Sequence, residues 1–332
     1  EHLRKGWVGS MLNVRGVKNV LAVQKIAVEE TRLGIPLIFG FDVIHGYKTL
    51  SPIPLAEAAS WDLEAIKKSA SIAAAEASAS GINWTFGPMV DISRDARWGR
   101  VMEGAGEDPF LGSKIAEARI TGFQGNDLSQ VNTIAACAKH FAGYGFSEGG
   151  RDYNSVYLGK HQLLNTVLPP FKAASDMGVA TFMNAFNDVD EVPSTANEYL
   201  LRDLLKGEWG SDGAVVSDWG SRAELMIHAV AKDSAEAAEF AIKAGSDIDM
   251  EGNIYVEQLE QLVADGVVPE SVLDDAVRRV LKLKSDLGIL DDPYKYFDED
   301  REKQTLLNEK HLEIDREAGK KSIVLIINEE EL

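Results

Sequence analysis

Short apolar runs alternate with longer amphipathic or alanine-rich segments from one end of the chain to the other. Apolar runs that are bounded by turn residues and separated by helix-length stretches are typical of β/α units that build a parallel sheet. An eighth strand is not evident. We expect seven strands, at residues 7–12, 36–41, 82–86 with a continuation to 92, 133–141, 179–184, 213–217 and 246–250.

Helices are expected between these strands, and several end next to a glycine that can close a helix. No short repeat, low-complexity tract or Gly/Ser linker interrupts the alternation before the C-terminal end of the chain. The pattern therefore predicts an α/β protein built as one TIM-type (β/α)₈ barrel, possibly incomplete at the eighth strand. The expected helices lie at residues 17–33, 63–80, 113–123, 198–205 and 234–244, with Gly81, Gly207 and Gly245 as closing glycines.

The composition excludes several classes of protein. Lys and Arg total 34 against 53 Asp and Glu, which gives a formal net charge of -19 for 332 residues. A surface of this sign repels phosphate backbones and anionic lipids, so we expect no nucleic acid partner. No apolar run approaches the length of a membrane span. The single cysteine, Cys137, can form no internal disulfide.

The most informative stretch is Gly213-Ala-Val-Val-Ser217-Asp218-Trp219-Gly220, where an apolar run ends in a carboxylate followed at once by an indole. In a (β/α)₈ barrel the ends of the strands open onto the active site, so Asp218 is a catalytic candidate. An aromatic face beside a carboxylate suits a sugar ring, which packs its apolar face on the indole and hydrogen-bonds through its hydroxyls. Alternatively, Asp218 only caps the helix that follows.

Polar side chains stand at the ends of four of the expected strands. Independent structural reasons could explain one or two of them, but four that converge on one barrel mouth favour a single polar site. These residues are Asp42 with His45, Lys139 with His140, Asn184, and Asp218.

Three further charged segments each admit two interpretations. The loop after the third strand holds Arg94, Asp95, Arg97, Trp98, Arg100, Glu103, Glu107 and Asp108, and for most of these we favour a salt-bridged surface loop. Residues 148–153 form either a turn or a loop that closes over a ligand. Asp247, Asp249 and Glu251 alternate with apolar residues, which admits a metal site or a second catalytic carboxylate, although we favour rim residues of the last strand.

Six motifs in order resemble the N-terminal barrel domain of glycoside hydrolase family 3, close to its β-glucosidases of bacterial periplasmic type. The resemblance covers most of residues 6–300. The motifs are Gly40-Phe-Asp42-Val-Ile-His45-Gly46, Asp95-Ala-Arg97-Trp98-Gly99-Arg100, Gly106-Glu107-Asp108-Pro109, Lys139-His140-Phe141-Ala-Gly-Tyr144-Gly145, Glu148-Gly-Gly-Arg151-Asp152-Tyr153-Asn154 and Val216-Ser-Asp218-Trp219.

The resemblance implies a retaining, exo-acting β-glucosidase that removes terminal non-reducing β-D-glucosyl residues by double displacement. Asp218 would be the nucleophile that forms the aspartyl-glycosyl intermediate, kept ionised at neutral pH by Lys139 and nearby arginines. We expect no cofactor and no metal; the substrate would be a β-glucoside or a short β-gluco-oligosaccharide, with xylose in place of glucose left open. The innermost sugar would be held by Asp42, Arg100, Lys139, His140, Arg151, Met183 and Trp219.

The chain also departs from the family. In two-domain members the general acid/base lies in a second α/β domain, and residues 322–332 resemble only the opening strand of that domain. We therefore expect a barrel at residues 1–310, a linker and first strand of an absent C-terminal α/β sandwich domain at 311–332, and weak or no activity for this chain alone. The family's opening helix is largely missing before Trp7, and Phe186 stands where a tyrosine near the nucleophile is frequent.

Other functions remain open. The family's single-domain N-acetylglucosaminidases carry a loop histidine in a Lys-His-Phe-Pro-Gly-His-Gly segment, but Ala142 and Tyr144 stand at the matching positions here. A β-xylosidase of the same family, a non-catalytic sugar-binding barrel and a Schiff-base aldolase that uses Lys139 are further alternatives. By resemblance, the protein is expected to be periplasmic or secreted.

Overall fold

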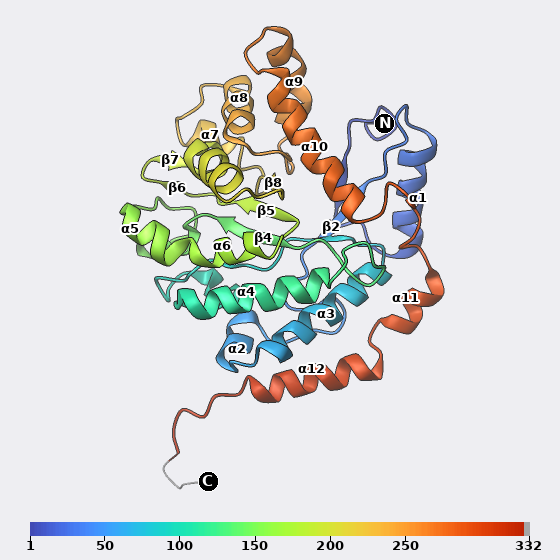
Figure 1. Ribbon diagram of the computed structural model, residues 1–332, viewed down its shortest axis with the longest axis vertical. Coiled ribbons are helices and arrows are strands. Elements are labelled where there is room, and N and C mark those ends of the chain that lie inside the picture. The colour runs from blue at the N-terminus through green and yellow to red at the C-terminus, as the bar shows by residue number, and fades with distance from the viewer. Residues whose placement is uncertain (329–332) are drawn as a thin grey trace.

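The computed structural model describes residues 1–328, and its sheet consists of parallel strands that follow the order of the chain (Figure 1). Two three-stranded groups are formed, and an antiparallel pair, β6 (Asp188–Val189) and β7 (Val192–Pro193), stands apart from them. The parallel groups are β1 (Ser10–Leu12), β2 (Ile38–Phe41) and β3 (Trp84–Thr85), then β4 (Cys137–Phe141), β5 (Thr181–Asn184) and β8 (Ala214–Val216).

Isolated parallel bridges connect the two groups. Trp84 is bridged to Ala135, and Met89 is bridged to Lys139. A further bridge joins Val216 of β8 to Ile248, in the segment that we expected to be the seventh strand. The six parallel strands and the Ile248 segment thus lie side by side in chain order. Residues 246–250 form one isolated bridge, at Ile248, and no regular strand. The prediction of a regular strand at these residues is therefore wrong.

Helices cover the outside of the sheet, with α3, α4 and α6 on one side of it and α8, α9 and α10 beyond β8 (Figure 1). The remaining helices are short or lie toward the chain ends. The helices are α1 (Val17–Glu29), α2 (Pro54–Ala59), α3 (Leu63–Ala79), α4 (Pro109–Gln124), α5 (Lys160–Gln162), α6 (Pro169–Asp176), α7 (Glu224–Ile227), α8 (Ser234–Ala244), α9 (Ile254–Ala264), α10 (Glu270–Asp286), α11 (Glu299–Thr305) and α12 (Glu309–Lys321).

The packing of α3 on α4 explains the alanine-rich sequence of α3. Ala70 and Ala77 of α3 are buried in the same apolar cluster as Phe123 of α4 and Phe141 of β4. Gly122 of α4 allows the two helices to approach closely, because a Cβ atom there would lie 2.5 Å from a backbone oxygen of α3. Small residues on both helices therefore allow α3 and α4 to pack closely against each other beside the central strands.

Local signals fix the ends of the helices largely where the sequence placed them. Asp62, Asp108 and Asp233 cap α3, α4 and α8 by accepting backbone N–H groups of the first turn. Gly245 closes α8 in the left-handed conformation, as expected. Gly207, in contrast, lies inside a π-helix (Tyr199–Glu208), so it does not close the helix predicted there.

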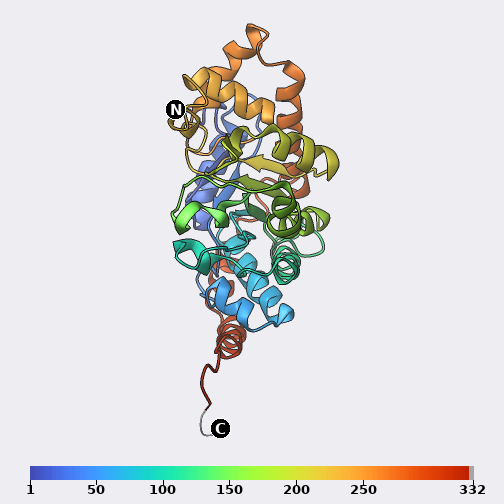
Figure 2. The same ribbon diagram turned by 90° about the vertical axis from the view of Figure 1, so that its left-hand side faces the viewer.

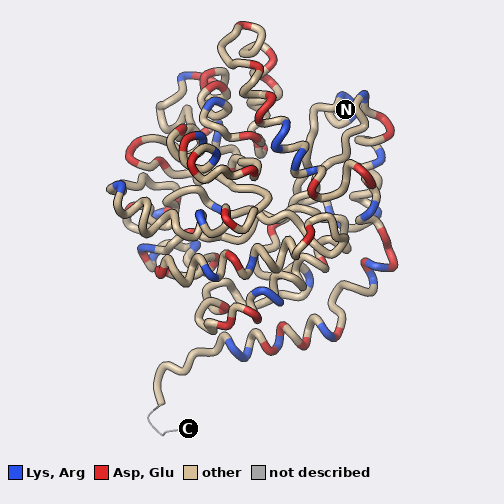
Figure 3. The backbone as a smooth tube through the Cα atoms, in the orientation of Figure 1, with Lys and Arg blue, Asp and Glu red and all other residues tan. Residues whose placement is uncertain are grey.

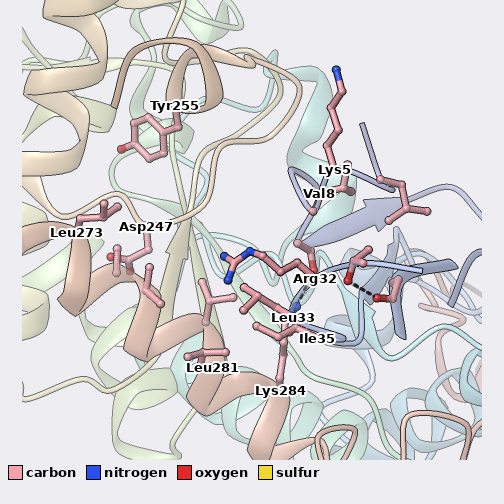
Figure 4. A pocket seen from close by; sticks show the side chains of 18 of the residues that line it. Lys5, Val8, Arg32, Leu33, Ile35, Asp247, Tyr255, Leu273, Leu281 and Lys284 are labelled. Carbon is pink, nitrogen blue, oxygen red and sulfur yellow. Dashed lines mark hydrogen bonds between the residues drawn. The ribbon is translucent and has the colours of Figure 1, made fainter. Parts of the chain in front are cut away.

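The predicted ring of eight strands is open in the described residues. No backbone hydrogen bond within residues 1–328 joins β1 to the segment around Ile248. A pocket lies at this seam, lined by Val8, Asp247, Tyr255, Leu281 and other mostly apolar residues (Figure 4). Lys284 of α10 is buried at its edge, where its Nζ donates to the carbonyls of Gly9 and Pro36 at 2.9 and 2.6 Å. Closure of the barrel by an eighth strand stays a prediction.

The chain after α10 turns back along the outside of the molecule (Figures 1 and 2). Glu76 of α3 fixes this return, because its carboxylate accepts from the backbone N–H of Leu307 at 2.9 Å and pairs with Nδ1 of His311 at 3.1 Å. Residues of both charges are interspersed along α12 (Figure 3). This helix crosses the predicted domain boundary at residue 310. Residues 323–328, where we expected a strand, hold no regular structure, and residues 329–332 lie outside the described residues.

Within residues 1–328, none of the helices combines the length and the apolar composition that crossing a membrane requires.

Candidate active site

A cavity of about 330 Å³ opens at the carboxyl ends of the parallel strands. Small-molecule sites usually occupy roughly 300 to 1,000 Å³, so this cavity is suited to one small ligand. Every residue that the sequence predicted to hold a sugar lies in its wall except Arg151. The lining consists of Leu12, Asn13, Asp42, Ile44, Phe86, Arg100, Glu103, Lys139, His140, Met183, Asp218, Trp219 and Met250.

Asp218 follows β8 after one residue, Ser217, and its side chain is only 12% exposed. Its Oδ1 accepts the backbone N–H of Trp219 at 2.7 Å. Its Oδ2 has no hydrogen-bond partner among the described residues and lies 3.5 Å from Nε2 of His140. A buried carboxylate oxygen without a partner is costly to desolvate. Oδ2 is therefore the atom of Asp218 that is left available to a ligand.

Burial raises the pKa of Asp218 to about 6, although the backbone hydrogen bond from Trp219 and the charges of Lys139 and Arg100 act to lower it. We expected the cations to keep this carboxylate ionised, and their influence has that direction. Burial outweighs them, but at pH 7 the carboxylate is still mostly ionised.

Buried hydrogen bonds and an ion pair around Ser217 and Arg222 fix the turn that carries Asp218. Oγ of Ser217 accepts from the Met250 backbone N–H at 2.9 Å and from the Arg222 guanidinium at 3.2 Å. Arg222 is itself buried, pairs with Asp249 at 3.0 Å and stacks on the ring of Tyr255 at 3.9 Å. These contacts hold the Asp218 backbone in place without occupying its carboxylate.

Lys139 and His140 are consecutive residues of β4, yet both side chains line the cavity. Consecutive residues of a regular strand point to opposite faces. The register of β4 against β5 shifts between Ala138 and Phe141, and this irregularity lets both side chains reach the cavity. Strand irregularities of this kind are frequent beside active sites.

Lys139 forms an ion pair with Asp42, with Nζ and Oδ1 3.2 Å apart. The two side chains differ in exposure: Lys139 is 6% exposed and Asp42 is 61% exposed. Asp42 thus reaches Lys139 from the open side of the cavity. The pair offers a ligand a charged donor and a charged acceptor side by side, and charge-assisted hydrogen bonds are stronger than neutral ones.

His140 is held by a second buried carboxylate, Asp91, which follows β3 in the connection to α4. Oδ2 of Asp91 accepts from the His140 backbone N–H at 2.7 Å and pairs with Nδ1 of the ring at 2.9 Å. Burial lowers the pKa of His140 well below its usual range, and the charges of Arg100 and Lys139 add to this effect. The imidazole is therefore neutral. Burial raises the pKa of Asp91 to about 7.

Arg100 enters the cavity with a carboxylate partner of its own. Its Nε and one terminal nitrogen bind the two oxygens of Glu103 at 2.7 and 2.9 Å. This bidentate pair fixes the plane of the guanidinium. Burial acts to raise the pKa of Glu103, but the hydrogen bond and the charge of Arg100 lower it overall. Glu103 belongs to the segment for which we favoured a salt-bridged surface loop for most residues; it forms such a salt bridge, and its side chain lines the cavity.

Apolar and aromatic residues complete the wall. Met183 of β5 is buried, whereas Trp219 is 54% exposed at the mouth of the cavity. Beside the cavity, the rings of Phe186 and Tyr153 are in tilted contact with centroids 4.5 Å apart, and Tyr144 contacts the ring of His140 edge to face at 5.0 Å. An aromatic face at the mouth of a polar cavity suits the apolar face of a sugar ring.

Arg151 lies outside the cavity. It is exposed, in the loop that contains Gly149 and Gly150, both with φ near the left-handed region at 66° and 67°. A Cβ atom at Gly149 would lie 3.5 Å from Nε of Arg151, so the arginine folds back over its own loop. Its predicted contact with the sugar is thus not formed in this arrangement and stays a prediction.

Several strand-end polar residues serve the fold. Nδ1 of His45 bonds with the carbonyl of Ser51, and the amide of Asn184 donates to Thr195 and is buried. Asp247 and Asp249, considered as a metal site, are paired with Lys206 and Arg222. Across residues 1–328, no group of three or more His, Cys, Asp or Glu side chains is placed to hold a metal ion.

The sequence analysis missed Asp91 and the apolar residues Leu12, Phe86 and Met250. Asp91 carries the same signal as Asp218, since the run Met89-Val-Asp91 ends in a carboxylate near a strand end. We had expected the strand at residues 82–86 to continue to residue 92, so Asp91 was assigned to the strand itself. In the structure β3 ends at Thr85, before Gly87-Pro88. Leu12 and Met250 end their own runs with apolar side chains, which gives no signal in the sequence.

Comparisons with known proteins agree with this geometry. The sequence profile of the glycosyl hydrolase family 3 N-terminal domain matches residues 1–283. The chain is similar to the periplasmic β-glucosidase of Salmonella typhimurium, with 38% identity over 331 residues that cover 99% of this chain and 43% of that protein. It is 35% identical over 322 residues to a β-xylosidase of Formosa agariphila, covering 91% of this chain and 44% of that protein.

Solved structures give the same result. The fold matches the β-glucosidase from Listeria innocua in complex with glucose with a TM-score of 0.94 and 44% identity, over 98% of this chain and 45% of that one. A mutant of the Listeria protein in complex with laminaribiose matches with a TM-score of 0.95 and 42% identity, over 98% and 45% of the two chains. The chain spans less than half the length of each of these relatives.

Proposed function

The chain belongs to glycoside hydrolase family 3, and we propose that it forms the sugar-binding and nucleophile-bearing part of a retaining, exo-acting β-glucosidase. The observation that carries the proposal is Asp218: a buried carboxylate with one unpartnered oxygen that faces a cavity of monosaccharide size. The relatives named above support a β-glucoside or a short β-gluco-oligosaccharide as substrate, since one was solved with glucose and with laminaribiose.

In the proposed reaction, Oδ2 of Asp218 attacks the anomeric carbon while the bond from that carbon to the leaving oxygen breaks. The product is an aspartyl-glycosyl ester, and water then displaces Asp218 with a second inversion, so that the configuration is retained. The oxocarbenium-like transition state is positively charged, and an ionised, largely buried Asp218 beside the anomeric carbon stabilises it.

The leaving oxygen needs a proton, and the other carboxylates of the cavity are poor donors. Asp42 is paired with Lys139, and Glu103 is held by two hydrogen bonds from Arg100. A cation beside a carboxylate favours its ionised form. We therefore infer that the general acid/base comes from a C-terminal domain of the complete protein. The similarity to the periplasmic β-glucosidase of Salmonella typhimurium separately supports the proposal that the protein is periplasmic or secreted.

The remaining cavity residues would recognise the sugar. Lys139 and Arg100 can only donate hydrogen bonds, Asp42 can only accept them, and Trp219 would cover the apolar face of the ring. Arg151 would join them only if its loop closes over the ligand. A hydroxyl that is bound by a desolvated charged group adds strongly to specificity, because a competitor without it leaves the group unpaired.

The experiment that tests the proposal is covalent trapping with 2,4-dinitrophenyl 2-deoxy-2-fluoro-β-glucoside, followed by peptide mass spectrometry. An adduct of one fluoroglucosyl group on the peptide containing Asp218 is expected, since this leaving group needs no proton. The labelling rate should rise as the pH passes 6, where Asp218 becomes ionised. No adduct would instead support a non-catalytic sugar-binding barrel, and an adduct on another carboxylate would contradict the assignment of Asp218.

A β-xylosidase is the second candidate, favoured by the Formosa relative. Dinitrophenyl β-xyloside lacks only the hydroxymethyl group of the glucoside, so the ratio of the two kcat/KM values decides between them. The aldolase alternative is disfavoured, because it assigns no role to Asp218, Trp219 and Arg100, which line the same cavity as Lys139. Borohydride trapping of a carbonyl substrate on Lys139 would instead support the aldolase alternative.

A further inference from the structure

Asp91 makes no direct contribution to the proposed chemistry, yet it is buried directly behind the cavity. It lies on the connection after β3, and its partner His140 lies on β4. Both hydrogen bonds from His140 reach the same oxygen, Oδ2, at 2.7 Å from the backbone nitrogen and at 2.9 Å from Nδ1. One carboxylate oxygen thus fixes both the backbone and the ring of a residue in the cavity wall.

When Asp91 is ionised, the geometry favours Nδ1 as the ring nitrogen that carries the proton. The backbone N–H of His140 can only donate, so Oδ2 acts as an acceptor toward it. An ionised carboxylate oxygen accepts a second hydrogen bond readily, and Nδ1 then carries the proton that it donates. A neutral imidazole has one ring proton, which leaves Nε2 with a free lone pair. Nε2 is the nitrogen that lies 3.5 Å from Oδ2 of Asp218.

We propose that Asp91 is a positioning residue: it holds His140 with the proton on Nδ1, so that Nε2 accepts a hydrogen bond from a hydroxyl of the bound sugar beside Asp218. The inference rests on the proposed function. Lys139 and Arg100 can only donate, so a hydroxyl that accepts from one of them has its own proton free for Nε2. A fluorine or hydrogen atom in its place cannot donate this hydrogen bond.

The proton position is measured by ¹⁵N NMR of the histidine rings at pH 8, where Asp91 is ionised. The His140 signal among the 6 histidines is assigned by its loss in His140→Asn. We expect the Nδ1–H form in the wild type and in Asp91→Asn, whose amide oxygen can accept both hydrogen bonds. In Asp91→Ala we expect the Nε2–H form to become populated. An Nε2–H form in the wild type overturns the proposal.

Kinetics with dinitrophenyl β-glucoside test the link to the sugar. The outer hydrogen-bond partners of metal-binding histidines are typically worth on the order of 10- to 100-fold in affinity or activity, and by analogy we expect a loss of this size in kcat/KM for Asp91→Ala. Asp91→Asn should recover most of it. Asp95→Asn is the matched control, because Asp95 lies in the same connection but pairs with Arg97 at the surface. It should leave kcat/KM unchanged.

A set of monodeoxy β-glucosides separates positioning from general stability. Removal of the hydroxyl that donates to Nε2 should cost the wild type activity and cost Asp91→Ala much less. Additive losses for every hydroxyl would overturn the proposal. Thermal unfolding of each variant shows whether it is folded. If no glucoside reacts at all, the proposed function fails, while the NMR measurement still decides the position of the proton.

Discussion

Two buried aspartates beside β8 differ in how completely they are bonded. Asp218 follows the strand, and one of its oxygens has no partner in the described part of the chain. Asp247 lies beside Val215 in the middle of β8, and its side chain is only 1% exposed. Its Oδ1 pairs with Lys206 at 2.6 Å and its Oδ2 accepts the Val215 backbone N–H at 2.8 Å. Burial is similar, whereas the hydrogen bonding is not.

The comparison extends to the two cavities. At the seam, the buried Lys284 donates to two carbonyls, and the rest of the pocket in Figure 4 is mostly apolar. At the mouth, cations and carboxylates converge and one carboxylate oxygen is left open. A buried charge whose hydrogen bonds are made within the protein needs no ligand to complete it. A buried charge that is left unsatisfied costs stability and is retained where a ligand completes it. The difference marks the mouth as the functional site.

The largest expected effect is on catalysis at the open carboxylate. Asp218→Ala should lower kcat with dinitrophenyl β-glucoside by more than about 10³-fold, because the nucleophile is removed. Azide should restore part of the turnover and give a product of inverted configuration. Asp247→Asn is the matched control and should keep its labelling by the fluoroglucoside. Equal losses in the two variants would remove the distinction between the sites.

The next effect is on stability at the bonded carboxylate. Asp247→Asn leaves the buried amine of Lys206 without its ion pair, and breaking a buried pair typically costs about 3 to 5 kcal/mol. The nearby Asp275, 3.7 Å from Lys206, should keep the loss at the lower end of that range. Urea unfolding of the variant and the wild type measures the change. A loss below about 1 kcal/mol, the size of an exposed pair, would show that this pair is not effectively buried.

A third effect concerns ligand binding at the mouth. Lys139→Met should weaken glucose binding by about 2 to 4 kcal/mol, since a ligand hydroxyl and Asp42 both lose a charged donor. Asp42→Asn should cost less, because the Asp42 side chain is 61% exposed and its amide can still accept a hydrogen bond. Titration calorimetry with glucose gives both values. Unchanged affinity in both variants would place the sugar elsewhere.

A fourth effect concerns stability at Asp218, where we expect a substitution to raise the free energy of unfolding, in contrast to the loss expected for Asp247→Asn. Burial raises the pKa of Asp218 from 3.8 to about 6, so ionisation of this carboxylate opposes folding. The destabilisation is absent well below pH 3.8, where the group is protonated in both states, grows as the pH rises from 3.8 to 6, and is complete above pH 6. Each pKa unit corresponds to about 1.4 kcal/mol. Asp218→Asn should therefore raise the free energy of unfolding, measured by urea unfolding, by about 1 to 3 kcal/mol at pH 8 and leave it nearly unchanged at about pH 3.

The strand order and most of the mouth could be predicted from the sequence, because parallel strands place their carboxyl ends at one edge of the sheet. The hydrogen-bond partners could not. Lys206 lies 41 residues from Asp247, and Asp91 lies 49 residues from His140, so neither pairing has a local signal. The register shift in β4 that brings Lys139 and His140 to the same cavity is likewise a tertiary feature. Local patterns thus identified the charged residues but not their partners, and hence not which carboxylate is left open.

The smallest effect is expected at Arg151, and it tests whether the mouth is complete as described. With this side chain exposed and folded over Gly149, Arg151→Ala should change glucose binding by less than about 0.5 kcal/mol, as usual for a surface substitution. If its loop closes over the sugar, the loss should instead approach that of Lys139→Met. Gly150→Ala then distinguishes the two cases, because its φ of 67° and a contact of 2.9 Å from a Cβ atom to the backbone of Trp98 leave no room for a side chain in the present loop. A shifted loop with unchanged affinity would confirm that Arg151 is dispensable, whereas a parallel loss in both variants would add the loop to the sugar-binding site.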